Sequence, residues 1–201
     1  MPSRRRVLAS LAALGAAGAI AGLGTYASFT NTTQASQTTS SGTVVVALGA
    51  TGASTNRLTV GASGLVAGDT VQRSVDLANT GNQGFASVAL TTSASPSSAL
   101  DTDTTNGLQM VIDRCSVAWT EAGASPAFTY TCTGTTSSVL ASAPVVGAGM
   151  ALANLSSLTA GNTDHLRVTL TLPAGAGNAL QNQSSTITYS FTATQRAATS
   201  Q

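Results

Sequence analysis

The segment His165-Leu-Arg-Val-Thr-Leu-Thr-Leu172 alternates strictly between polar and apolar side chains. Successive side chains of a β-strand point to opposite faces of a sheet, so this alternation predicts a strand with one buried face and one polar face. The segment Thr186-Ile-Thr-Tyr-Ser-Phe-Thr-Ala193, close to the C-terminus, repeats this pattern. A third segment, residues 70–79, has an apolar face made of Val71, Val75 and Leu77.

The rest of the chain also favours strands and turns over helices. Thr, Ser, Ala, Val, Gly and Leu dominate, whereas Lys is absent and Glu occurs once. Residues 43–48 predict a strand buried on nearly both faces, residues 85–92 predict another, and residues 93–106 predict a long polar loop. We therefore expect about seven to nine strands, no helix after the N-terminal leader, and an all-β fold that is a jelly roll or a two-sheet antiparallel β-sandwich.

The two cysteines, Cys115 and Cys132, suggest a hairpin. If they face each other across two paired strands, Val117 falls opposite Tyr130 and Trp119 opposite Phe128, which gives three apolar cross-strand pairs in one register. Residues 121–126 would then form the connecting loop. In an exported protein we expect the cysteines to form a structural disulfide, because a redox or metal role would need CxxC spacing or further soft ligands.

The N-terminus has the organisation of a secretory signal peptide. Three arginines precede an apolar segment at residues 7–23, which ends in the small-residue sequence Thr25-Tyr-Ala27. We expect cleavage between Ala27 and Ser28, so that a membrane is involved only through the uncleaved leader; a retained anchor is the alternative. The sequence Ser3-Arg-Arg-Arg-Val-Leu8 fits twin-arginine export as well as the general secretory route.

Four segments follow from this organisation: a signal peptide at 1–27, a polar segment at 28–41, a β-sandwich domain at 42–196 and a polar tail at 197–201. After removal of the leader, five arginines and seven carboxylates give a net charge of −2. A chain with so few cations and no basic cluster lacks the electrostatic pattern of a nucleic-acid-binding protein. We therefore expect a secreted protein with no nucleic-acid partner.

Motifs at both ends of the chain resemble the TasA and camelysin family. They are Gly22-Leu-Gly-Thr-Tyr-Ala-Ser-Phe-Thr-Asn31 with Ser41-Gly-Thr-Val-Val-Val46, then Ala67-Gly-Asp69 and Val75-Asp-Leu-Ala-Asn-Thr-Gly81, and finally Asn178-Ala-Leu-Gln-Asn-Gln-Ser-Ser-Thr-Ile-Thr-Tyr-Ser-Phe-Thr-Ala-Thr-Gln195. The resemblance implies a jelly-roll subunit, cleaved by a dedicated signal peptidase, that assembles into fibres of a biofilm matrix. It also implies that the freed N-terminus of one subunit adds a strand to the next, and that minor matrix subunits are partners of the fibre.

Mapped onto this chain, the implied donor strand comprises Ser28, Phe29, Thr30, Asn31, Thr32, Thr33, Gln34, Ala35 and Ser36. Strand addition completes an open sheet edge with main-chain hydrogen bonds, while alternate side chains fill a groove. This donor is polar, and Phe29 and Ala35 are its main apolar residues. Main-chain pairing would therefore supply most of the binding energy. A monomeric adhesive or ligand-binding β domain on the cell surface is the alternative.

Camelysin-type relatives are described as surface metalloproteases, which makes a zinc peptidase the enzymatic alternative. Hydrolytic zinc normally takes three protein ligands and an activated water. This chain has one histidine, His165, and one glutamate, Glu121, and it lacks the sequence HExxH. No GxSxG sequence marks a nucleophilic serine either. We expect no enzymatic activity and no cofactor.

Two further patterns are weaker. Asp101, Asp103 and Asn106 lie close together in one loop and have oxygen ligands that suit calcium, but the same residues are common turn formers. The loop lacks the Gly and the distal Glu of an EF-hand. Asn31, Asn154 and Asn182 begin N-x-Ser/Thr sequons, which matter only in a host that glycosylates proteins.

Overall fold

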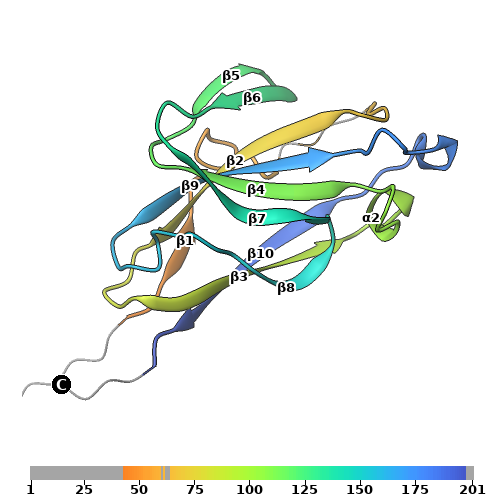
Figure 1. Cartoon of the computed structure of the whole chain (residues 1–201). Coiled ribbons are helices and arrows are strands. Elements are labelled where there is room, and N and C mark those ends of the chain that lie inside the picture. The colour runs from red at the N-terminus through yellow and green to blue at the C-terminus, as the bar shows by residue number, and fades with distance from the viewer. Residues whose placement is uncertain (1–42, 60, 62–63, 198–201) are drawn as a thin grey trace, which may run out of the picture. The chain divides into compact units, whose positions relative to one another are not determined.

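The computed structural model describes residues 43–59, 61 and 64–197 (Figure 1). The chain divides into two units, and residues 41–201 make up the second of them. The signal peptide, the cleavage site at Ala27 and Ser28, the donor segment at 28–36 and the last four residues of the polar tail lie outside the described residues.

The described residues fold mainly into antiparallel strands. The strands are β1 (Val46–Leu48), β2 (Thr70–Asn79), β3 (Phe85–Ala94), β4 (Gln109–Cys115), β5 (Thr120–Ala124), β6 (Ala127–Thr131), β7 (Thr136–Pro144), β8 (Gly147–Ala151), β9 (Thr163–Thr171) and β10 (Ile187–Gln195). A five-stranded sheet has the order β1-β2-β9-β4-β7, a three-stranded sheet has the order β10-β3-β8, and β5 and β6 form a separate hairpin. In Figure 1 the three-stranded sheet lies below the five-stranded sheet and the hairpin lies above it.

This arrangement confirms the predicted all-β sandwich and the alternating strands on which that prediction rested. Val75 and Leu77 of β2 and Leu166 and Val168 of β9 point into the space between the sheets, where each is at most 1% exposed. Paired residues keep the alternation in register, as Val75 lies opposite Leu166. Polar residues of both strands consequently share the outer face of the five-stranded sheet.

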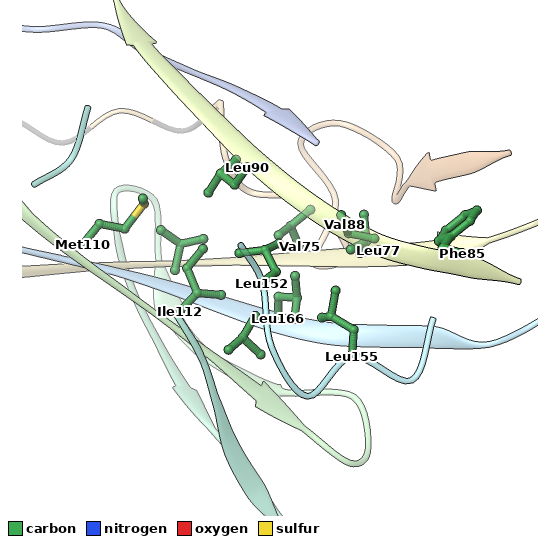
Figure 2. Packing of buried hydrophobic residues seen from close by; sticks show 12 residues of the cluster. Val75, Leu77, Phe85, Val88, Leu90, Met110, Ile112, Leu152, Leu155 and Leu166 are labelled. Atoms are coloured by element: carbon green, nitrogen blue, oxygen red, sulfur yellow. The ribbon is translucent and has the colours of Figure 1, made fainter. Parts of the chain in front are cut away.

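One core joins the two sheets (Figure 2). Leu90 and Val88 of β3 lie across from Val75, Leu166 and the methionine and isoleucine of β4. The buried members of this cluster are Val75, Leu77, Phe85, Val88, Leu90, Met110, Ile112, Val139, Leu152, Leu155, Leu166 and Val168. Burial of branched aliphatic side chains at about 25 cal/mol per Å² is the main force that holds the sheets together.

The sequence did not predict the helix α2 (Ala99–Thr102) or the 3-10 helix η1 (Asn178–Leu180). The first begins at a capping box: Ser98 Oγ accepts from the Leu100 N–H, and the Asp101 carboxylate accepts from the Ser98 N–H. A segment of four helical residues is too short to show a helical period, so only its cap is visible in the sequence.

The first strand is shorter and more exposed than predicted. Residues 43–48 were expected to form a strand buried on nearly both faces, but β1 begins at Val46, and Val45 and Leu48 are each 40% exposed. The reason is position: β1 is the edge strand of the five-stranded sheet and pairs with β2 alone among the described strands. A run of valines indicates a strand but does not show how much of the protein covers it.

The disulfide between Cys115 and Cys132 is confirmed, with a Cα–Cα distance of 5.7 Å, but the predicted hairpin register is wrong. Glu121 lies opposite Tyr130 and Gly123 opposite Phe128, four positions away from the predicted pairing. Cys115 is the last residue of β4 in the five-stranded sheet and is not part of the hairpin.

The disulfide therefore ties the hairpin to the sheet instead of joining the two strands of the hairpin. Phe128 and Tyr130 are buried beneath the hairpin, and the Tyr130 N–H donates to Gln72 Oε1 of β2 at 3.2 Å. The Trp119 indole, just before β5, donates to the His165 carbonyl at 2.9 Å. The hairpin thus covers part of the sheet's outer face as a small third layer.

Removal of the disulfide should loosen this layer. The double variant Cys115→Ala/Cys132→Ala should lose about 3 kcal/mol of unfolding free energy, because the bond closes a loop of 17 residues. Denaturant titration followed by tryptophan fluorescence would measure the loss, since Trp119 is the only tryptophan. A variant as stable as the parent would contradict the structural role of the bond.

Candidate functional site

The two sides of the sandwich are closed to different extents. On one side β7 ends at Pro144 and β8 begins at Gly147, so a short link with the fully buried Val145 joins the two sheets. On the other side the edge strands β1 and β10 face each other without pairing. The lower sheet has three strands and the upper sheet five, and no described strand pairs with the outer edge of β10.

A groove of about 1240 Å³ lies at this open side. Apolar side chains line it from three directions: from the inner face and edge of the five-stranded sheet, from the start of β10, and from the loop between β1 and β2. The apolar lining residues on these elements are Leu48, Val71, Leu170, Ile187, Tyr189, Leu58, Leu65 and Val66. A large apolar groove with polar residues at its rim is a common form of binding site.

The strand β10 forms the lower wall of the groove and is incompletely covered. Its inward residues Ile187, Tyr189 and Phe191 are only partly buried, whereas Leu90 of the neighbouring β3 is fully buried. Burial nevertheless raises the pKa of Tyr189 to about 12, an effect that the positive charge of Arg73 partly opposes. The Tyr189 hydroxyl is therefore poorly solvated.

A network of hydroxyl groups fixes the chain where it enters β10. Ser185 Oγ donates to the Asp101 carboxylate, which also accepts from Ser97 Oγ at 2.6 Å and from the Ser98 N–H at 2.7 Å. Burial disfavours the charge of Asp101, but hydrogen bonds from Ser185 and Ser97 outweigh this effect and lower its pKa. The network holds residues 181–186, which line one end of the groove, against α2.

The calcium candidates lie in two separate networks. Asp101 takes part in the network just described, while Asp103 Oδ1 accepts from the Asn106 N–H at 2.9 Å and from the Thr105 N–H at 3.0 Å. These hydrogen bonds lower the pKa of Asp103. The Asn106 side-chain amide donates to the same carboxylate at 3.3 Å, and the hydrogen bond from the Thr105 N–H to Asp103 is that of an Asx turn.

The residues that a zinc peptidase would need are also engaged elsewhere. His165 Nδ1 lies 2.8 Å from Asp76 Oδ1 on the outer face of the sheet. Glu121 accepts from Arg57 at 2.7 and 3.0 Å and from the Tyr130 hydroxyl at 2.9 Å, and the hydrogen bonds from Arg57 are the main reason that its pKa is lowered.

No three His, Cys, Asp or Glu residues of the described part of the chain gather closely enough to hold a metal ion. The sequence places none of these four residue types in 1–42, 60, 62–63 or 198–201. A carboxylate held by an arginine and a lone histidine held by an aspartate do not fit a hydrolytic zinc centre, which takes three ligands and keeps one position open for water.

The fold and the groove define a class: a two-sheet antiparallel β-sandwich with an apolar groove beside the edge strands β1 and β10. The sequence model of the camelysin metallo-endopeptidase family matches residues 4–200, so the chain belongs to the camelysin family. A search of curated proteins found no match. Membership in this family, which the end motifs indicated, supports a protein of the surface or secreted type. Among the described helices, none has the length and apolar character needed to cross a bilayer.

Sequence reasoning predicted a donor segment, which lies outside the described residues, but missed the groove. Leu58, Leu65 and Val66 come from a segment that the sequence analysis left unassigned between two strands, yet all three line the groove. The available signal was the presence of large apolar residues in a Gly- and Ser-rich segment that is too irregular to form a strand. Val66 lines the groove and is 64% exposed.

Proposed function

We propose that this chain is a secreted structural protein whose copies assemble into fibres of the extracellular matrix. In this proposal the leader is removed after Ala27, and residues 28–36 of one copy enter the groove of the next copy as an added β-strand. The chain carries out no catalytic step, in keeping with the separate engagement of His165 and Glu121.

The observation that carries the proposal is the apolar groove beside the start of β10, an edge strand whose outer side no described strand pairs with. A strand added there would extend the three-stranded sheet to four strands. Neighbouring strands lie about 4.8 Å apart, so the new strand would cover the partly buried side chains of β10. It would also satisfy main-chain groups at the start of β10, where Ile187, Thr188 and Tyr189 line the groove.

The ends of the sandwich also suit assembly in a row. Thr43 lies at one end, where its N–H donates to Asn82 Oδ1 at 2.6 Å, close to the turn before β3. The last residue of β10, Gln195, pairs with Phe85 at this same end. The groove opens at the other end, beside α2 and η1, where β10 begins. We refer to these as the Thr43 end and the η1 end.

A segment attached at the Thr43 end of one copy can therefore reach a groove that opens at the η1 end of another. Such a contact uses two different surfaces, and repeated contacts of this kind give an open filament unless the rotation between copies closes a ring. Each copy would supply one donor and one groove, so a single kind of subunit suffices for growth.

The composition of the donor suits pairing with the edge of a sheet better than insertion into a deep pocket. In an extended strand, Phe29, Asn31, Thr33 and Ala35 share one face. Phe29 and Ala35 can contact the apolar lining, while the Thr and Asn side chains are compatible with the polar residues at the rim. Thr also has a high propensity for strands. Most of the attraction then comes from main-chain hydrogen bonds.

Electron microscopy of the processed chain tests the proposal. Residues 28–201, concentrated and incubated, should form filaments in negative stain, whereas a chain that begins at Gly42 should remain monodisperse. The melting temperatures should nearly agree, because residues 41–201 form a compact unit of their own. Filaments from both chains would contradict donation by residues 28–36. Monodisperse particles from both would favour a monomeric surface-binding domain.

A further inference from the structure

We propose that the outer face of the three-stranded sheet pairs with the same face of a second copy, so that rows of copies associate side by side. The outward residues of β3, β8 and β10 form this face, which we call the hydroxyl face (Figure 1). Of its residues only Thr188 also lines the groove. The inference rests on the proposed assembly into rows, because the area of the face suits repeated contacts better than a single one.

The distribution of charge first sets this face apart. Charged side chains are absent from β3, β8 and β10, which the structure describes throughout. The charged residues of the other described strands belong to the five-stranded sheet and the hairpin, and they are Arg73, Asp76, Asp113, Arg114, Glu121, Asp164 and Arg167. The core of a protein–protein interface is likewise poor in charged residues. Two copies of the hydroxyl face can therefore meet without repulsion and without burying a charge.

The outward side chains are small, and most of them carry a hydroxyl group. Thr192 of β10 lies beside Ala89 of β3, and Ala151 of β8 lies on the other side of Ala89. Ser190 lies beside Thr91 in the next row. The remaining outward residues of β3 and β10 are Ser87, Ser93, Thr188 and Thr194, all of them exposed. Because a hydroxyl group both donates and accepts hydrogen bonds, the face is complementary to a second copy of itself.

Small side chains also lower the entropic cost of such a contact. Ala and Gly lose no rotamer freedom on burial, whereas the long side chains of Lys, Arg, Glu and Gln lose the most. Two sheets pack face to face with their strands nearly aligned, and small side chains allow a close approach. A contact between identical faces has a twofold axis, so it joins copies in pairs across two rows and does not itself extend a row.

The area of the face indicates what kind of partner it suits. β10 has nine residues, and at about 3.3 Å per residue and about 4.8 Å per strand the face measures roughly 30 by 14 Å, or about 400 Å². A stable complex usually buries about 800 Å² on each partner. One pair of copies should therefore separate readily. Copies held in a row add their contacts, provided that successive copies present the face on the same side.

Beads coated with the chain 28–201 through its C-terminus test the face apart from fibre growth, because the bead supplies the array of copies. Parent beads should clump. The variant Ala89→Arg/Ser93→Arg places two cations on the central strand of the face, and its beads should stay dispersed. Thr192→Arg, at an exposed position beside Ala89, should cause the same loss. Ala127→Arg/Thr131→Arg is the matched control, with the same charges and spacing at exposed positions of β6 in the hairpin, and should clump like the parent.

Parent beads that stay dispersed would overturn pairing between copies. Clumping of the Ala89→Arg/Ser93→Arg and Thr192→Arg beads to the extent of the control would overturn pairing through this face, even if filaments form. Clumping that requires addition of a neutral polysaccharide such as dextran would assign the face to that kind of polymer and would also overturn self-pairing.

Electron microscopy of the same chains separates this inference from the proposed function. Parent and control filaments should lie side by side in bundles, whereas filaments of Ala89→Arg/Ser93→Arg should be single and equally long. Clumped parent beads without filaments in solution would contradict the fibre proposal alone. All variants should keep a melting temperature close to that of the parent, because the substituted side chains point away from the core.

Discussion

The variant Leu48→Asp should stop fibre growth without unfolding the protein. Leu48 is the last residue of β1, lines the groove and is 40% exposed in the isolated subunit. A carboxylate there remains hydrated in the free subunit but would lose water when a donor strand covers it. An uncompensated desolvation cost of about 3 kcal/mol would raise the dissociation constant of each subunit contact on the order of 100-fold. Light scattering and electron microscopy would record the loss of fibres.

Val117→Asp is the matched control for this experiment. Val117 is another exposed apolar residue, 44% accessible, but it lies between β4 and β5 and does not line the groove. It should assemble like the parent chain, and both variants should keep a melting temperature close to that of the parent. If Leu48→Asp assembles as well as Val117→Asp, the groove is not the acceptor.

The strands with strict alternation could be predicted from the sequence because their pattern has a direct physical cause. In β2, β9 and β10 every second side chain faces the core, so polar residues at the other positions mark the strand without reference to the rest of the fold. Arg73 is an exception: it lies on the core face of β2 and is 5% exposed, with its guanidinium donating to the carbonyls of Gln72 and Gly61.

The hairpin register and the groove could not be predicted, because both depend on which strands become neighbours. The pairing of Cys132 with Cys115 was correct, but no pattern in the sequence indicated that Cys115 lies in a strand of the sheet beside His165. In the same way, Leu48 and Tyr189 line one groove only because β1 and β10 are edge strands on the same side of the sandwich. The order of strands in a sheet is not contained in the period of any one strand.

Asp164 shows a further feature that residue type alone does not reveal. It precedes His165 in β9 and has a side chain with no exposed surface. Its carboxylate accepts from the N–H groups of Ser156 and Ser157, each at 2.8 Å, from Ser156 Oγ at 2.6 Å, and from Arg114 at 3.2 Å. Four donors thus fix the loop before β9 to the end of the core.

We expect Asp164→Asn to cost about 3 kcal/mol of unfolding free energy at neutral pH, because an amide cannot accept all four hydrogen bonds and leaves Arg114 without its counter-charge. Guanidinium titration at pH 7 would measure the loss. Asp103→Asn is the control: it also removes a hydrogen-bonded carboxylate, but from an Asx turn at the surface, so its effect should be smaller. Equal effects of the two substitutions would contradict the special role of Asp164.

The difference between the parent and Asp164→Asn should shrink in acid. Burial disfavours the charge of Asp164, but hydrogen bonds from Ser156 and Ser157 outweigh it and lower the pKa below its ordinary value of 3.8. A carboxyl group whose pKa is lower in the folded state stabilises the protein fully above its unfolded pKa, and this contribution disappears as the pH falls through the folded pKa. The parent should therefore lose stability below about pH 4 more steeply than the variant. Titrations from pH 7 to 2 that kept a constant difference would show that the charge of Asp164 contributes nothing.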